Sequence, residues 1–120
     1  LYYPHQLSDG TLRYICLATL LLQPNPASTI VIDEPELGLH PQAIKLLSSL
    51  LHEAAERAQL IVATQSSMLL DEFEPEQVIV VNHRDGETIL DRQDPDRLNE
   101  WLKEYTLGQL WEKNELGGQP

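Results

Sequence analysis

The sequence has little cysteine and no long apolar run, and each shortage excludes a class of protein. One cysteine among 120 residues cannot form an intrachain disulfide. The apolar runs fall far short of the roughly 20 residues that a membrane-spanning helix needs. Apolar residues nevertheless make up 42% of the chain, which is too many for a disordered segment. We therefore expect a soluble globular chain without disulfides.

Basic side chains are also scarce. Eight Lys and Arg face nineteen Asp and Glu, for a formal charge of −11, and residues 71–120 hold thirteen of the acids. Because nucleic-acid phosphates are bound largely through Lys and Arg, this segment is not expected to bind nucleic acid, although a longer parent protein could do so elsewhere. No charged-then-apolar leader precedes Leu1, so a cytoplasmic location without a membrane partner is expected.

The first half of the chain alternates between helical and strand patterns, as in an α/β fold. Residues 11–22 are apolar on almost every side, which predicts a buried helix with Cys16 in the core. The β-branched run 29–32 is typical of a strand covered on both faces. Pro41 suits the first turn of an amphipathic helix, and residues 60–63 form the next strand. This strand–helix–strand order predicts a parallel pair with a right-handed crossover.

The second half predicts smaller elements. Residues 78–81 read as a third strand, and Asp85-Gly86 favours a tight turn into residues 88–90, so that a strand or hairpin closes the sheet edge. Asp94 is expected to cap a short amphipathic helix. Residues 114–120 offer almost nothing to bury and are predicted to form a flexible tail.

Two adjacent carboxylates at the end of the first predicted strand are the strongest chemical signal. Asp33 and Glu34 lie where α/β sheets bind ligands, and successive strand side chains point in different directions. One carboxylate could hold a Mg²⁺ shell while the other polarises an attacking water. The alternative is an ordinary strand end with two solvated acids.

Two further segments carry polar residues at expected element ends. In the segment 7–13, Ser8 and Gly10 precede a helix, which suits either an anion site or a plain helix cap. Residues 64–66 end the second predicted strand, so they should lie beside the carboxylates if the strands are parallel neighbours. Alternatively, they cap a helix over residues 67–72.

Three segments carry these signals along the chain: 7–13, the strand that ends in Asp33 and Glu34, and 64–66. In that order, they resemble the C-terminal half of an ABC-type ATPase head, in the branch that contains RecF-like, Rad50-like and SMC-like proteins and the ATPases grouped as AAA_21. The resemblance covers residues 1–120. It matches the signature motif to 7–13, the Walker B strand to 29–34, the D-loop to 36–41 and the switch to 61–66. It implies a P-loop NTPase-like parallel sheet with flanking helices, of which this chain is the C-terminal part.

The resemblance also implies catalytic roles and two cofactors, ATP and Mg²⁺. Asp33 would hold Mg²⁺ through water, and Glu34 would be the general base for water attack on the γ-phosphate. The family usually has His at the switch position, where this chain has Gln65. An amide can orient a water or a phosphate oxygen but cannot carry a proton, so hydrolysis is expected to be tuned differently.

Other matched residues would act between two heads that dimerise around ATP. Ser8, Asp9 and Gly10 of the signature would contact a nucleotide held by the opposite subunit. Gly38 and His40 belong to the D-loop, where Gly38 would allow close approach across the dimer. The resemblance therefore implies that the chain self-associates, with ATP sandwiched between two heads.

The phosphate cradle of these ATPases, G-x-x-x-x-G-K-[ST], is absent from the 120 residues, and the chain begins with Leu1 rather than Met. We therefore expect a piece of a larger ATPase whose N-terminal, Walker A half is its partner, with this piece inactive alone. The parent's hydrolysis could serve DNA repair, recombination or phage defence. The alternative is a non-catalytic dimerisation or interaction module derived from an ATPase head.

Overall fold

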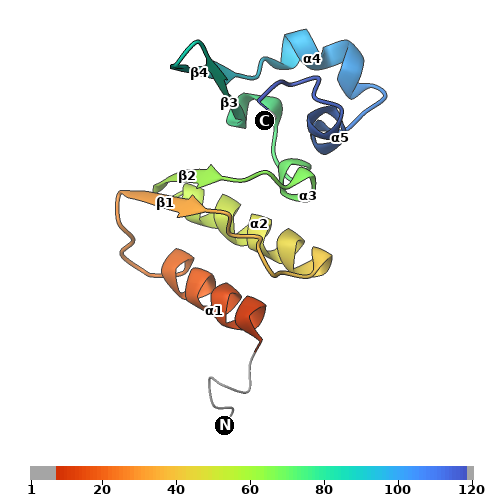
Figure 1. Cartoon of the computed structure of the whole chain (residues 1–120). Coiled ribbons are helices and arrows are strands. Elements are labelled where there is room, and N and C mark those ends of the chain that lie inside the picture. The colour runs from red at the N-terminus through yellow and green to blue at the C-terminus, as the bar shows by residue number, and fades with distance from the viewer. Residues whose placement is uncertain (1–7, 119–120) are drawn as a thin grey trace. The chain divides into compact units, whose positions relative to one another are not determined.

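Residues 8–118 are described by the computed structural model, and they divide after Gln65 into two units (Figure 1). The first unit holds two helices and a pair of strands, and the second holds a hairpin and several short helices. Each unit has its own elements and is described by itself.

The first helix, α1 (Asp9–Leu21), begins two residues before the predicted helix over 11–22 and ends one residue before its predicted end. Ser8 is its N-cap and accepts a hydrogen bond from the Thr11 backbone N–H. Its C-terminal carbonyls are satisfied from a distant part of the chain, because the Arg57 guanidinium donates to Leu21 O at 2.9 Å and to Gln23 O at 2.8 Å. The last carbonyls of a helix lack partners within the helix, so this contact anchors the end of α1.

The predicted strand–helix–strand unit is confirmed. Strands β1 (Thr29–Asp33) and β2 (Gln59–Ala63) pair in parallel, with Asp33 opposite Ala63, and α2 (Pro41–Ala55) connects them. Pro41 stands at the first helical position, where a missing N–H costs nothing. Helix α2 contacts both β2 and α1. Its buried stripe is Ile44, Leu47, Ser48, Leu51 and Ala54.

The strands of the first unit are buried on fewer faces than predicted. Ile30 and Ile32 of β1 are buried, whereas Val31 between them is 70% exposed. The prediction of a strand covered on both faces is therefore wrong for the described residues. An apolar run shows that a face can be buried, but α2 covers only one face of this strand pair, so the side chains that point the other way stay exposed.

Helix α1 is likewise not the buried helix that was predicted. Leu21 is its only buried residue, and Ile15 and Leu22 are 48% and 51% exposed. Cys16 is exposed as well, so its predicted place in the core is wrong. Within residues 8–118, α1 packs mainly on α2, and one neighbour can cover only one side of a helix that is apolar all round.

The second unit contains an antiparallel hairpin of β3 (Ile79–Arg84) and β4 (Glu87–Arg92). Its turn residues, Asp85 and Gly86, have φ of 50° and 80°, the positive values that a two-residue turn of this twist requires. The hairpin forms its own two-stranded sheet. The predicted hairpin is therefore confirmed, but the prediction that it closes the edge of the parallel sheet is wrong for the described residues.

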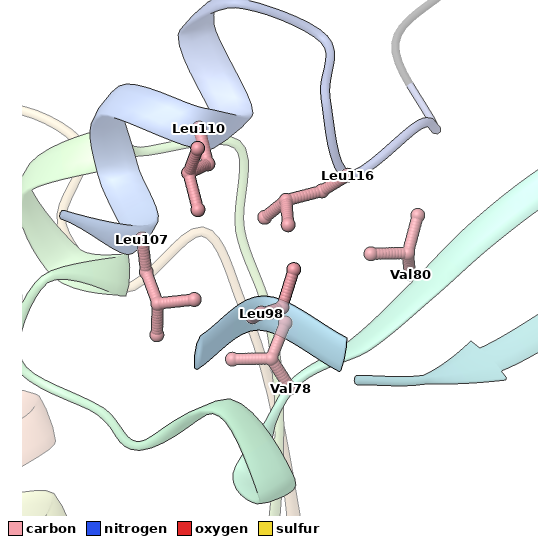
Figure 2. Packing of buried hydrophobic residues seen from close by; sticks show 6 residues of the cluster. All are labelled: Val78, Val80, Leu98, Leu107, Leu110 and Leu116. Atoms are coloured by element: carbon pink, nitrogen blue, oxygen red, sulfur yellow. The ribbon is translucent and has the colours of Figure 1, made fainter. Parts of the chain in front are cut away.

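Four short helical segments complete the second unit: α3 (Ser67–Leu70), the 3₁₀ turn η2 (Pro75–Gln77), α4 (Pro95–Leu102) and α5 (Leu107–Glu112). Asp94 caps α4 as predicted, accepting from Asp96 N at 2.9 Å. Figure 2 shows the cluster at the core of this unit, which comprises Val78, Val80, Leu98, Leu107, Leu110 and Leu116.

The position of Leu116 corrects the expectation that residues 114–120 offer almost nothing to bury, whereas the flexibility of that tail stays a prediction. Leu116 is 7% exposed and belongs to this cluster, so the segment does bury an apolar side chain. A lone Leu beside two glycines gives no periodic signal, so its long-range packing could not be read from the sequence. Residues 119–120 lie outside the described residues.

Within residues 8–118, no helix combines the length and the apolar character needed to cross a membrane.

Two adjacent leucines on α2 provide a matched test of this packing. Leu47 is fully buried and Leu46 is 59% exposed. We predict that Leu47→Ala lowers the free energy of unfolding by about 2–5 kcal/mol because it leaves a cavity. Leu46→Ala should change it by less than about 0.5 kcal/mol. Urea unfolding followed by far-UV circular dichroism measures both, and equal losses would contradict the packing described here.

Candidate functional site

The carboxyl ends of β1 and β2 bring the two expected polar segments together. Asp33 is opposite Ala63 in the parallel register, and Glu34 N donates to Ala63 O at 2.8 Å. The residues that follow each strand, Glu34 on one and Thr64 on the other, therefore leave the sheet side by side. This is the edge at which open α/β sheets bind ligands.

The two carboxylates differ in backbone conformation and exposure. Glu34 has φ of 46°, a left-handed value that costs a residue with a Cβ about 1–3 kcal/mol and persists only where the surroundings enforce it. The neighbouring Pro35 is fully buried and fixes the chain directly after it. Asp33 is exposed, whereas Glu34 is partly buried. The two carboxylates therefore lie in different surroundings, and the expectation that they perform two different tasks stays a prediction.

The segment 36–41 packs against the beginning of α1. Gly38 has φ of 76°, and a Cβ added to Gly10 would lie 2.2 Å from the Gly38 carbonyl oxygen. Only glycine at position 10 permits this backbone approach. The resemblance assigned Gly38 a role between two subunits. Here both glycines meet within one chain, and the role between subunits stays a prediction.

The start of α1 supports the cap interpretation of Ser8. The Ser8 hydroxyl accepts from Thr11 N at 3.2 Å and lies 2.8 Å from the Thr11 hydroxyl. Asp9, in the first helical turn, suits the positive end of the helix dipole. Both Ser8 and Asp9 are exposed, so the anion interpretation stays a prediction, and Leu7 lies outside the described residues.

Two further residues of the matched motifs have local contacts. His40 is the N-cap of α2, where its Nδ1 accepts from Gln42 N at 3.4 Å. Ser66 caps α3 by accepting from Leu69 N at 3.2 Å, so the cap interpretation of residue 66 is confirmed. Gln65, the expected switch residue, directly follows Thr64 and is exposed.

Sequence reasoning missed the role of Glu36. The Thr64 hydroxyl donates to Glu36 Oε1 at 2.5 Å, across 28 positions of sequence. The second carboxylate oxygen, Oε2, is buried and has no hydrogen-bond partner among the described residues. The sequence also gave no sign of the contact of Arg13, whose guanidinium donates to Asp33 O at 3.5 Å. Neither contact follows a periodic pattern, so no local signal could have revealed it.

The acidic residues at this edge would give a metal ion few protein ligands. Residues 8–118 contain no group of three His, Cys, Asp or Glu side chains placed to hold a metal, which a structural zinc site would require. Mg²⁺ is held by one or two carboxylates together with waters and substrate phosphates. The exposed Asp33 carboxylate makes no hydrogen bond within the described part of the chain and suits that role.

Replacing Gly10 tests the contact between α1 and the segment 36–41. In a helix, Ala is usually better than Gly by about 0.8–1.0 kcal/mol. We predict the opposite sign for Gly10→Ala, a loss of about 1–3 kcal/mol, because the new Cβ collides with Gly38 O. Thr19→Ala, at an exposed site on the same helix, should change stability by less than about 0.5 kcal/mol. Urea unfolding measures both variants, and stabilisation by Gly10→Ala would refute the contact.

Comparison with known proteins places these motifs in a family. Residues 2–71 match the AAA_21 family, described as "AAA domain, putative AbiEii toxin, Type IV TA system". A protein of Caldanaerobacter subterraneus subsp. tengcongensis, "Putative ABC transporter ATP-binding protein TTE0246", is 33% identical over 87 residues, covering 72% of this chain and 35% of that protein. A "Putative ABC transporter ATP-binding protein" of Methanosarcina acetivorans is 32% identical over 78 residues, covering 64% of this chain and 28% of that protein. The chain thus spans about a third of these relatives.

A solved structure shows the fold. It is described as "Structural biochemistry of ATP-driven dimerization and DNA stimulated activation of SMC ATPases", and it superposes with a TM-score of 0.62 at 21% identity, over 83% of this chain and 62% of the other. The parallel strands with their flanking helices therefore have a P-loop NTPase-like fold, which they share with that SMC ATPase structure. The family match spans more than half of the 120 residues, so the chain belongs to the AAA_21 family.

Proposed function

We propose that this chain supplies the signature, general-base and switch side of an ATPase head. The observation that carries the proposal is the edge where β1 and β2 end, at which Asp33 and Glu34 leave one strand beside Thr64 on the other. The AAA_21 match over residues 2–71 includes all four matched motifs. The beginning of α1, which would contact a nucleotide, is packed on the segment that follows Glu34.

In this proposal, hydrolysis depends on positioning and electrostatics rather than on covalent chemistry. Glu34 orients the attacking water and accepts its proton, and its enforced backbone conformation aims the carboxylate. Asp33 holds Mg²⁺ through water, and the bound ion would neutralise the charge that develops on the phosphates. Gln65 orients water or a phosphate oxygen by hydrogen bonding, because a side-chain amide does not act as a general acid or base at neutral pH.

The proposed partner is a second head that binds the other side of the nucleotide. Ser8, Asp9, Gly38 and His40 are all exposed and therefore accessible to another subunit. The SMC structure with the same fold is described in terms of ATP-driven dimerisation. We extend that relation to this chain as part of the proposal. DNA repair, recombination and phage defence stay open as the process that hydrolysis drives.

A second candidate is a non-catalytic interaction module. It is favoured by Gln65 at the switch position and by the lack of a phosphate cradle in the 120 residues. Such a module would use the same exposed motif residues for association but would not turn over ATP. The two candidates differ in whether Glu34 has a chemical task.

The charge of Glu34 provides the test. In a protein that combines this chain with the cradle-bearing half, we predict that Glu34→Gln lowers ATP turnover by roughly 10²–10⁴-fold, because the amide keeps the shape but loses the base. Binding of ATP should be retained. Glu53→Gln, an exposed site on α2, is the control that should leave turnover unchanged. Turnover that survives Glu34→Gln would refute the catalytic assignment and leave the interaction module.

The chain alone provides a complementary prediction. Because no cradle is present to hold the phosphates, the 120-residue chain should show no measurable Mg²⁺-dependent ATPase activity, and adding a separately produced cradle-bearing half should restore it. Phosphate release measures the activity of the chain alone and of the chain with the added half. Activity of the chain alone would contradict the expected division of the head, and association without turnover would favour the module.

A further inference from the structure

The hydrogen bond between Glu36 and Thr64 joins the two segments that carry the proposed catalytic residues. Glu36 lies two positions after Glu34, and Thr64 lies immediately before Gln65. The Thr64 hydroxyl donates to Oε1 of Glu36 across 28 positions of sequence, so the contact links two segments that are distant along the chain. None of the roles proposed above uses this contact.

The environment of Glu36 indicates that its hydrogen bond with Thr64 fixes the geometry of the two segments more than it stabilises the fold. Oε2 of this carboxylate is buried without a hydrogen-bond partner among the described residues, and a buried acceptor without a donor costs free energy. An apolar pair would hold the two segments together without that cost. A hydrogen bond adds direction, because the hydroxyl and the carboxylate must align.

The contact also bears on the strained backbone of Glu34. A left-handed φ at a residue with a Cβ persists only when several neighbouring contacts enforce it. Three such contacts surround Glu34: its own N–H bound to Ala63 O, the buried Pro35, and the bond from Glu36 to Thr64. The first ties the segment after β1 to the last residue of β2, and the third ties it to the segment after β2.

We infer that Glu36 is a positioning residue that acts through Thr64 to fix Glu34 relative to Gln65. It does so without contact to the nucleotide or to the reacting water. The inference rests on the proposed ATPase function and deepens it, because it names a pair that sets the geometry of the general base and the switch residue.

The first test separates positioning from binding. Thr64→Val removes the hydroxyl but keeps the β-branched shape, and Glu36→Leu removes the carboxylate. In the protein that includes the cradle, each should lower kcat by about 10–100-fold, because small misplacements of catalytic groups cost that much. The KM for ATP should stay within about twofold, because no binding contact is lost. Thr64→Ser, which keeps the hydroxyl, should restore most of kcat.

Thr29 offers a matched control at the other end of the same strand pair. Its hydroxyl donates to Gln59 Oε1 at 3.4 Å, so it also links β1 to β2 by a side-chain hydrogen bond. Thr29→Val should leave kcat unchanged. Equal losses in Thr29→Val and Thr64→Val would overturn the inference, because any weakening of the strand pair would then explain both.

A double variant tests whether the two residues act as one unit. Thr64→Val combined with Glu36→Leu should lower kcat no further than the stronger single variant, because either change already breaks the bond. Losses that multiply would mean independent roles and would overturn the inference.

A measurement on the 120-residue chain keeps this inference separate from the ATPase proposal. Hydrogen exchange at the backbone amides of residues 64 and 65 should be several-fold faster in Thr64→Val and Glu36→Leu than in the unchanged chain or in Thr29→Val. Unchanged exchange would overturn the inference. If Glu34→Gln abolishes turnover while Thr64→Val does not affect it, the inference fails and the ATPase function stands. If Glu34→Gln has no effect but exchange responds as expected, the ATPase function fails while the coupling of the two segments remains.

Discussion

The backbone contact between Gly10 and Gly38 is the constraint on which the arrangement of the site depends. It fixes the beginning of α1 against the segment that follows β1, where no side chain at position 10 could fit. That segment also carries Glu34 and Glu36, and it continues into α2 through the His40 cap. One short stretch of chain therefore connects the helix start, the strand-end carboxylates and the segment after β2.

Features with a local cause could be predicted from the sequence. The position of β1, the Pro41 start of α2, the Ser8 cap and the Asp85-Gly86 turn each depend on residues within a few positions. The parallel pairing followed from the length of the connection between the two strands. The place of Asp33 and Glu34 at the end of β1 belongs to this group, whereas their catalytic roles stay predictions.

The errors arose where contacts are distant in sequence. An apolar helix such as α1 and an apolar strand such as β1 show that they can be buried, but not which element covers each face, so the sequence did not show which of their side chains stay exposed. Leu116 packs on residues of β3 and α5 that no local pattern connects to it. The contacts of Arg57 with the end of α1 and of Glu36 with Thr64 span 36 and 28 positions, and they became visible only with the fold.

The central claim is that the signature segment and the segment after β1 form one assembly within a single chain. The most direct test is a nuclear Overhauser measurement on the isotopically labelled 120-residue chain in solution. The Gly10 Cα lies 3.5 Å from the position of a Cβ built on Gly38, so a cross peak between the α protons of the two glycines is predicted. If the strand pair β1–β2 gives its own expected cross peaks while that between Gly10 and Gly38 is missing, the account is contradicted.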